Sequence, residues 1–350
     1  MEKLQNNTEK SNSMLYINFN QDSSCFAVGT QTGFRILNTI PFKNNFCRDM
    51  NGGIGLIEML NRSNILALIG GGISPRYSSN KLVLWDDHKQ KEISEMRFMS
   101  SVRNVKMKRD RLFVVTEDKI YVFNFNTLEL LDTLETKNNT KGIVSISLVG
   151  NNLIAYPDKT EVGSVRIKDY DKQNEIVIKA HKGPINFIQL NKDGTILATA
   201  SDKGTLIRLF DTSTGEAIQE LRRGTENAEI YSIAFDSTNR FLAVSSDRKT
   251  VHIFLINNQD KTELNENEGN IVSNKKNMFG NFANFLGIGK KYFNSEWSFA
   301  QFKVNGTKSI CTFGPDNSII IISNDGKYYQ ASYDPKVGGE CKKIQEHNIF

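Results

Sequence analysis

Histidine and cysteine are scarce in this sequence, and their spacing does not match the common metal sites. The 350 residues contain four histidines and four cysteines, and no two cysteines form a CxxC pair. GxxxxGK[ST], GxSxG and HExxH motifs are also missing. The widely spaced cysteines are typical of reduced thiols in the cytosol. The sequence therefore gives no reason to expect an enzyme, a metal site or a cofactor.

Long apolar runs and a strong charge bias are missing as well. No window approaches the ~18 apolar residues of a membrane-spanning helix, and residues 1–13 are polar, without the apolar core of a secretory signal. Lys and Arg number 44 against 39 Asp and Glu, an excess too small for a dedicated nucleic-acid binder. We therefore expect a cytoplasmic chain without a nucleic-acid partner, whose membrane contacts are peripheral.

Proline is also rare, with six residues, whereas phenylalanine is frequent, with 22. This composition favours β-strands. One pattern recurs along the chain: an alternating apolar strand, a polar turn, a second apolar strand, another turn and a third strand. It is clearest in residues 185–210 and 230–254, where Asp202 aligns with Asp247. The chain is therefore built from repeats of one strand-rich unit.

Seven copies of this unit can be counted, most of them about 41–48 residues apart, which is the period of a four-stranded propeller blade. Trp85-Asp86 and Phe210-Asp211 stand where WD-type units place that dipeptide, at the end of the third strand. The sequence predicts an all-β fold, a seven-bladed WD-repeat-type β-propeller; the alternative is a pair of β-sandwiches. The expected domains are a polar tail at 1–13, the propeller at 14–338 and a C-terminal tail at 339–350.

Two adjacent arginines, Arg222 and Arg223, close the fifth unit in the segment ELRRG. Neighbouring residues on a strand point to opposite faces, so the two side chains can serve two different pockets. The planar guanidinium binds phosphate through paired charge-assisted hydrogen bonds. Each side offers further polar residues: His181, Thr199, Ser201, Thr205 and Arg208 on one, and Ser246, Thr250 and His252 on the other. The alternative is that these clusters only hold the blades together and that the arginines lie in a solvated turn.

Several longer motifs make this pattern specific. They are FNQD at 19–22, GGG to WDD at 70–87, AHKGP at 180–184, ASDKGTLIR at 200–208, LRRG at 221–224 and KYFNSEWSFA at 291–300. Together they resemble the PROPPIN family of phosphoinositide-binding β-propellers, the WIPI-type autophagy proteins, over about residues 15–338. The LRRG motif fits the shorter branch of that family.

This resemblance implies binding of phosphatidylinositol 3-phosphate and phosphatidylinositol 3,5-bisphosphate at two rim sites. Carried over by position, the first site comprises His181, Thr199, Ser201, Thr205, Arg208 and Arg222, and the second comprises Arg223, Ser246, Thr250 and His252. Asn20 and Asp22 of FNQD would help to bind an autophagy-related lipid-transfer protein. The resemblance also implies a monomer that associates peripherally with autophagosomal, endosomal or vacuolar membranes.

The sixth unit carries an insertion at residues 257–295, here called the inserted segment. Its apolar residues follow the spacing of one helical face, bordered by the lysines of KK at 275–276 and 290–291. Such a helix suits an anionic membrane surface, and in the family the corresponding loop inserts into the membrane. The residues predicted to insert are Met278, Phe279, Phe282, Phe285 and Leu286.

Two alternatives remain open from the sequence. The inserted segment could pack on the propeller or be unfolded in water. The chain as a whole could be a lipid-independent WD-repeat protein-interaction scaffold, in which the two arginines bind an acidic peptide.

Overall fold

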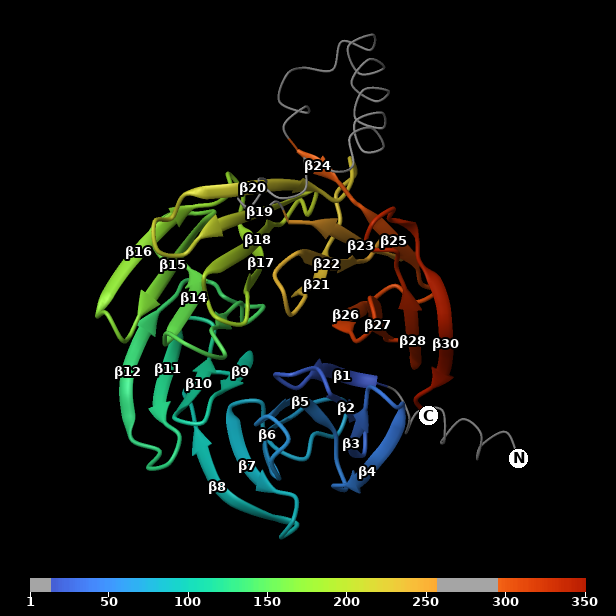
Figure 1. Cartoon of the computed structure of the whole chain (residues 1–350). Helices are drawn as coiled ribbons and strands as arrows, with labels where there is room; N and C mark the ends of the chain where they lie inside the picture. Colours follow the sequence, from blue (N-terminus) through green and yellow to red (C-terminus); the bar gives the residue numbers. More distant parts are fainter. Residues whose placement is uncertain (1–13, 257–294) are drawn as a thin grey trace.

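A computed structural model describes residues 14–256 and 295–350, which form seven sheets arranged around a ring (Figure 1). The five residues predicted to insert into a membrane lie outside the described residues. The four main strands of each sheet come in chain order and pair antiparallel, so the seven-bladed propeller predicted from the repeats is confirmed. Within residues 14–256 and 295–350, no helix has the length and apolarity that crossing a bilayer requires.

The first four sheets contain four strands each. Their bounds are β1 (Met14–Phe19), β2 (Cys25–Thr30), β3 (Gly33–Asn38) and β4 (Lys43–Asp49); β5 (Ile54–Met59), β6 (Ile65–Gly70), β7 (Lys81–Asp86) and β8 (Lys91–Arg97); β9 (Asn104–Met107), β10 (Arg111–Val115), β11 (Lys119–Asn124) and β12 (Leu130–Glu135); and β13 (Ser145–Ile146), β14 (Leu153–Pro157), β15 (Ser164–Asp169) and β16 (Asn174–Lys179).

The last three sheets contain two additional short strands. Their bounds are β17 (Ile185–Leu190), β18 (Ile196–Ser201), β19 (Leu206–Asp211), β20 (Ala217–Arg222) and β24 (Glu296–Trp297); β21 (Ile230–Phe235), β22 (Phe241–Ser246), β23 (Thr250–Leu255), β25 (Ala300–Lys303) and β29 (Gly339–Glu340); and β26 (Ser309–Gly314), β27 (Ser318–Ser323), β28 (Lys327–Ser332) and β30 (Lys342–Asn348). The additional strands, β24 and β29, each pair parallel with the strand beside them.

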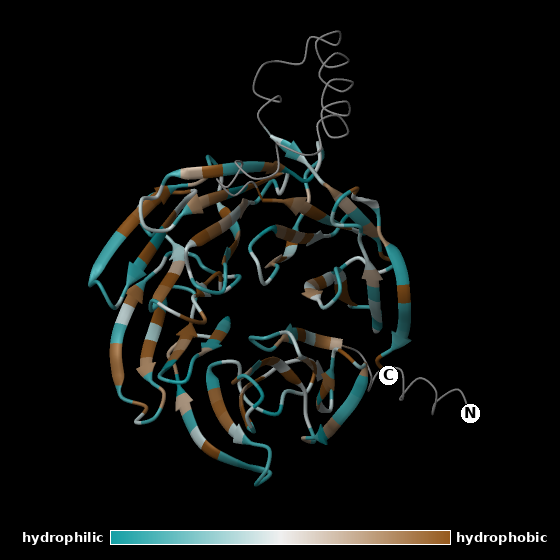
Figure 2. Ribbon diagram, in the orientation of Figure 1, coloured by the Kyte–Doolittle hydropathy of each residue, from teal (hydrophilic) through white to brown (hydrophobic). Residues whose placement is uncertain are grey.

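Burial changes from the inner to the outer strands of a sheet. Every residue of β2, an apolar strand, is buried, whereas the polar outer strand β4 is mostly exposed. Figure 2 shows hydrophilic and hydrophobic residues interspersed along the outer strands. The apolar cores lie between neighbouring sheets, because each sheet presents side chains on both of its faces.

The ring closes through side chains between the first and last sheets. β1 belongs to the first sheet and β30 to the seventh, so the two ends of the propeller share no sheet. Tyr328 donates a hydrogen bond of 2.8 Å to the carbonyl of Thr39, and the rings of Phe42 and His347 stack with their centroids 4.7 Å apart. An apolar cluster that includes Phe26 fills the space between these sheets.

The C-terminal boundary differs from the one expected from the sequence. Residues 342–348, assigned above to a tail, form β30 and pair with β28 as the outer strand of the seventh sheet. The segment KKIQEHN is polar because an outer strand is mostly exposed, and this polarity makes such a strand look like a tail. The WD-type dipeptides lie where they were predicted, at the ends of β7 and β19.

Candidate functional site

Arg222 and Arg223 stand at the edge of the fifth sheet, where β20 ends. Arg222 pairs with Leu206 of β19, and the preceding residue, Leu221, is fully buried in the core shared with the sixth sheet. Because side chains alternate along a strand, Arg222 lies on the face opposite to Leu221, towards the fourth sheet. Both arginines are buried, with 7% and 6% of their surface exposed.

A cavity of about 500 Å³ opens beside Arg222. It lies between the loop that leads into the fifth sheet, the β18–β19 turn and the adjacent strands β19 and β20. The residues that line it are His181, Lys182, Gly183, Ser201, Lys203, Thr205, Leu206, Arg208, Glu220 and Arg222. Four cations and several hydroxyls therefore surround one carboxylate, which is a composition suited to an anionic ligand.

The carboxylate of Glu220 organises the cations of this cavity. Arg208 donates to it through Nε at 2.9 Å and also to the carbonyl of Ala180 at 2.6 Å. Ser295 links Glu220 to Arg222, because its hydroxyl donates to Glu220 at 2.7 Å and accepts from Arg222 at 3.2 Å. Burial opposes ionisation of Glu220, but the Ser295 hydroxyl and Arg208 prevail and lower its pKa. The cavity thus holds an ionised carboxylate among arginines.

His181 forms one wall of the cavity and is held by Thr199. The Nε2 atom of His181 lies 2.9 Å from the Thr199 hydroxyl, which is fully buried beneath the cavity. Burial, and then the nearby charge of Arg208, lower the pKa of His181 to about 4. The imidazole is therefore neutral at neutral pH in the free protein.

Arg223 lies on the other side of the same strand edge and is held by backbone carbonyls. Its Nε donates to the carbonyl of Gly204 at 2.8 Å, and its terminal nitrogen donates to the carbonyl of Glu226. Gly204 has φ of +58°, and a Cβ there would lie 1.9 Å from the carbonyl of Ala228, so this turn needs glycine. Burial and the charge of Arg248 lower the pKa of Arg223.

His252 shares the surroundings of Arg223. Burial and then the Arg223 charge lower the pKa of His252 to about 4, and its buried Nδ1 has no hydrogen-bond partner among the described residues. At the nearby β22–β23 turn, the Ser246 hydroxyl accepts from the Arg248 amide at 3.3 Å and the Thr250 hydroxyl donates to the Arg248 carbonyl at 3.4 Å. An acceptor-bearing ligand would satisfy an imidazole N–H at this position.

The structure brings most residues of the first predicted site together. Five of the six line the cavity, and the sixth, Thr199, lies directly beneath it. Sequence reasoning missed Lys182, Lys203, Glu220, Ser295 and Arg248. The two lysines stand inside the motifs AHKGP and ASDKGTLIR and were within reach of the sequence, whereas Ser295 is 73 residues from Arg222 and no local signal links them.

The FNQD loop follows β1. Asn20 is only 4% exposed: it accepts from the Cys25 amide at 3.0 Å and donates to the carbonyl of Asn61 at 3.2 Å. Asp22 is exposed and accepts from the Ser24 amide at 3.0 Å. In the structure, Asn20 shapes the turn and Asp22 presents a carboxylate at the surface.

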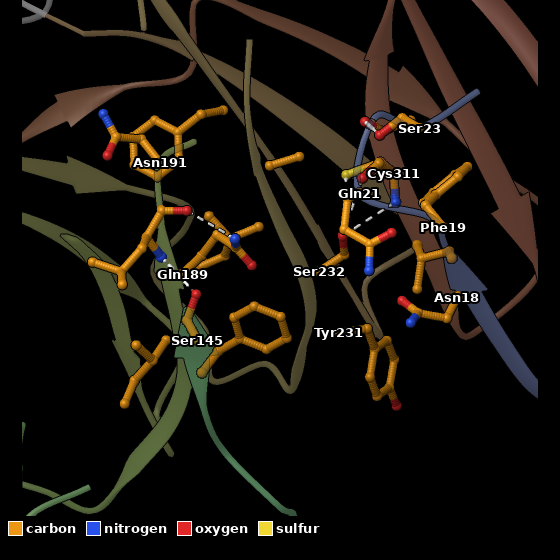
Figure 3. Close-up of a pocket in the computed structure, with 18 of the residues that line it drawn as sticks. Asn18, Phe19, Gln21, Ser23, Ser145, Gln189, Asn191, Tyr231, Ser232 and Cys311 are labelled. Carbon is orange, nitrogen blue, oxygen red and sulfur yellow. Dashed lines mark hydrogen bonds between the residues drawn. The ribbon is translucent and has the colours of Figure 1, made fainter. Parts of the chain in front are cut away.

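A second cavity, of about 710 Å³, runs along the inner strands of all seven sheets. Figure 3 shows part of its lining, including Ser145, Gln189 and Tyr231. Buried Glu58 lines it, accepts from Asn18 at 2.7 Å and lies 3.6 Å from the ammonium of Lys106. Burial raises the pKa of Glu58 in spite of that lysine. The contacts of Glu58 with Asn18 and Lys106 join the first three sheets. Within the described residues, no three His, Cys, Asp or Glu side chains gather as metal ligands.

The chain is thus a seven-bladed β-propeller in which one strand edge directs two buried arginines into separate polar surroundings. A family model described as PROPPIN matches residues 13–350. Autophagy-related protein 18 of Dictyostelium discoideum is 34% identical over 96% of this chain and 94% of its own length. SVP1-like protein 2 of Saccharomyces cerevisiae is 36% identical over 83% of this chain and 73% of its own.

Solved structures agree with these relatives. Hsv2 of Kluyveromyces lactis superposes with a TM-score of 0.76 and 26% identity, covering 97% of this chain and all of that one. The chain belongs to the PROPPIN family of autophagy-related β-propellers.

Proposed function

We propose that this protein is a peripheral membrane effector that binds the headgroups of phosphatidylinositol 3-phosphate and phosphatidylinositol 3,5-bisphosphate. The observation that carries the proposal is the divergence of two buried arginines from one strand edge. Arg222 would serve the cavity between the fourth and fifth sheets, and Arg223 the surroundings of His252 between the fifth and sixth. Membership of the PROPPIN family supports this proposal.

The first site fits a phosphorylated inositol ring by its chemistry. Lys182, Lys203, Arg208 and Arg222 supply charge around a cavity of about 500 Å³. The hydroxyls of Ser201 and Thr205 supply neutral donors at the same cavity. Charge-assisted hydrogen bonds from arginine contribute roughly 1.5–3 kcal/mol each, so two or three of them give a weak but specific site.

The second site has fewer cations than the first, but its arrangement is equally specific. Arg223 is fixed by two carbonyls, and the buried Nδ1 of His252 lacks a hydrogen-bond partner among the described residues. Arg248, 45% exposed at its side chain, adds a cation that a headgroup could recruit away from its surface ion pair with Glu226.

Membrane attachment would combine these two sites with the inserted segment. Its predicted apolar face, which lies outside the described residues, would enter the bilayer while both headgroups are held. Tethering makes the second and third contacts intramolecular, so the combined affinity exceeds that of any one contact. The protein would thereby act on autophagosomal, endosomal or vacuolar membranes.

Autophagy-related partners would bind elsewhere on the ring. We propose that Asp22 contacts a lipid-transfer protein and that Asn20 keeps the loop in shape, because Asp22 is exposed and Asn20 is buried. An Asp22→Ala variant should lose the partner and keep lipid binding. Loss of both activities would argue against a separate partner surface.

Vesicle co-sedimentation tests the lipid proposal. Arg222→Thr with Arg223→Thr should abolish binding to vesicles that contain 3-phosphoinositide, across a panel of phosphoinositides, and leave the circular dichroism spectrum unchanged. Arg97→Thr with Arg103→Thr is the matched control, because it removes the same charge from exposed arginines of the second and third sheets. Equal binding by all three proteins would reject the proposal and favour the lipid-independent scaffold.

The contribution of the inserted segment is tested separately. Phe282→Ser with Phe285→Ser should weaken vesicle binding and spare binding of a soluble inositol headgroup, because burial of each phenylalanine contributes about 1.5–3 kcal/mol only when a bilayer is present. If both kinds of binding fell equally, insertion would not be the cause.

A further inference from the structure

An exposed tryptophan stands directly beside Arg222. Trp297 belongs to β24, which pairs parallel with β20 so that Trp297 lies opposite Arg222. The Arg222 guanidinium carbon lies 6.0 Å from the centre of the indole ring. Trp297 is nevertheless 56% exposed, and Figure 1 places β24 at the outer edge of the ring, outside β20.

The chain is fixed at the two residues that precede this tryptophan. Ser295 bridges Arg222 and Glu220, and the carboxylate of Glu296 accepts from the Gln219 amide at 2.9 Å. The indole is therefore presented on an anchored strand, next to a cavity for anions. More than half of the surface of this large aromatic residue faces water.

We propose that Trp297 is an interfacial lipid contact that acts together with Arg222. Indole rings favour the headgroup level of a bilayer, where the apolar ring and the polar N–H are both accommodated. A headgroup phosphate held by Arg222 would place the bilayer surface at the depth of this ring. The inference rests on the proposed lipid binding and adds a described residue of the propeller itself to the membrane contact.

The occupant is a membrane surface rather than a soluble anion. The cations of the cavity already supply the charge that a free phosphate needs, and the electron-rich face of an indole does not attract an anion. Its exposed apolar ring beside an anion site matches a ligand that is charged at one end and apolar at the other. A phospholipid has that chemistry.

Intrinsic fluorescence provides a direct test, because the chain has only two tryptophans and the other, Trp85, is 8% exposed. The emission of Trp297 is obtained as the difference between the wild-type protein and Trp297→Phe, so no core residue is changed. On vesicles of phosphatidylcholine with 3-phosphoinositide, this difference spectrum should shift to shorter wavelength. Lipids brominated near the headgroup should quench it.

Affinity provides the second measurement. Trp297→Ala should weaken binding to the same vesicles on the order of tenfold and change binding of soluble inositol 1,3-bisphosphate by less than twofold, whereas Trp297→Phe should keep most of the vesicle affinity. Ile344→Ala, which removes a side chain of similar exposure (55%) on β30, is the matched control and should change neither.

The outcomes separate this inference from the lipid proposal. If the protein co-sediments with the vesicles but the Trp297 emission neither shifts nor is quenched, the inference is wrong and the lipid proposal stands. Equal losses of soluble headgroup and vesicle binding in Trp297→Ala would make the ring a support for Arg222 and also overturn the inference. If the wild-type protein binds no vesicles, the lipid proposal fails and the inference fails with it.

Discussion

The two sides of the β20 edge bind their arginines by different means. Arg222 is held through side chains, by the Ser295 hydroxyl next to the carboxylate of Glu220. Arg223 is held through main-chain carbonyls of Gly204 and Glu226, and among the described residues no carboxylate pairs with it. Side chains, which can rearrange, thus position the guanidinium of Arg222, whereas the backbone positions that of Arg223.

This difference indicates how each site would respond to a ligand. A phosphate entering the Arg222 cavity competes with Glu220, an anion that is already in place. A phosphate reaching Arg223 competes with neutral carbonyls for its hydrogen bonds. We therefore expect the first site to be the more sensitive to side-chain changes and the second to be the more rigid.

The largest effect is expected from removing one arginine at a time. Arg222→Thr and Arg223→Thr should each weaken vesicle binding roughly 10- to 100-fold, since each removes a charge-assisted contact of about 1.5–3 kcal/mol. Arg223→Thr should also lower the melting temperature more than Arg222→Thr, because it leaves two carbonyls without their buried donor. Co-sedimentation and thermal melts of both variants check this, and identical melting would contradict the proposed difference.

Acid should destabilise the surroundings of Arg222 and those of Arg223 to a similar degree. His181 and His252 have pKa values of about 4 when folded, below the 6.5 of an ordinary histidine. Between pH 6.5 and 4 the unfolded chain binds more protons, so the stability present above pH 6.5 is lost as the pH falls through this window. We expect a loss of at most about 3 kcal/mol per histidine in the free energy of unfolding.

Denaturant melts at several pH values measure that loss. A variant with His181→Gln and His252→Gln should show a flatter dependence of stability on pH between pH 6.5 and 4.5. A slope as steep as that of the wild-type protein would mean that other groups titrate there.

The smallest effect is expected at the serines. Ser295→Ala removes the hydroxyl between Arg222 and Glu220 and should cost about 0.5–1.5 kcal/mol of stability. In an Arg223→Thr background it should also weaken headgroup binding severalfold. Ser246→Ala, on the other side of the strand, loses only a longer contact of 3.3 Å and should change stability less. A larger loss of stability in Ser246→Ala than in Ser295→Ala would contradict the greater role of side chains at the Arg222 site.

Local rules predicted much of this arrangement. Strand alternation alone separates Arg222 from Leu221, and the repeat period places the dipeptides of β7 and β19 correctly. His181 and Arg208 come from neighbouring turns and strands of one repeat, so their meeting at the cavity follows from the repeat.

Long-range pairing was not predictable in this way. Ser295, 73 residues after Arg222, meets it only because the two-residue parallel strand β24 adds to the edge of the fifth sheet. Two residues carry no periodic pattern. Residues 342–348 were misassigned because a polar outer strand has no alternation strong enough to distinguish it from a tail.

Calorimetric titration with soluble inositol 1,3-bisphosphate tests the central claim most directly, because it counts sites without a membrane. We expect two sites in the wild-type protein, one in Arg222→Thr, one in Arg223→Thr and none when both are changed. A single site in the wild-type protein that survives either single change would contradict it.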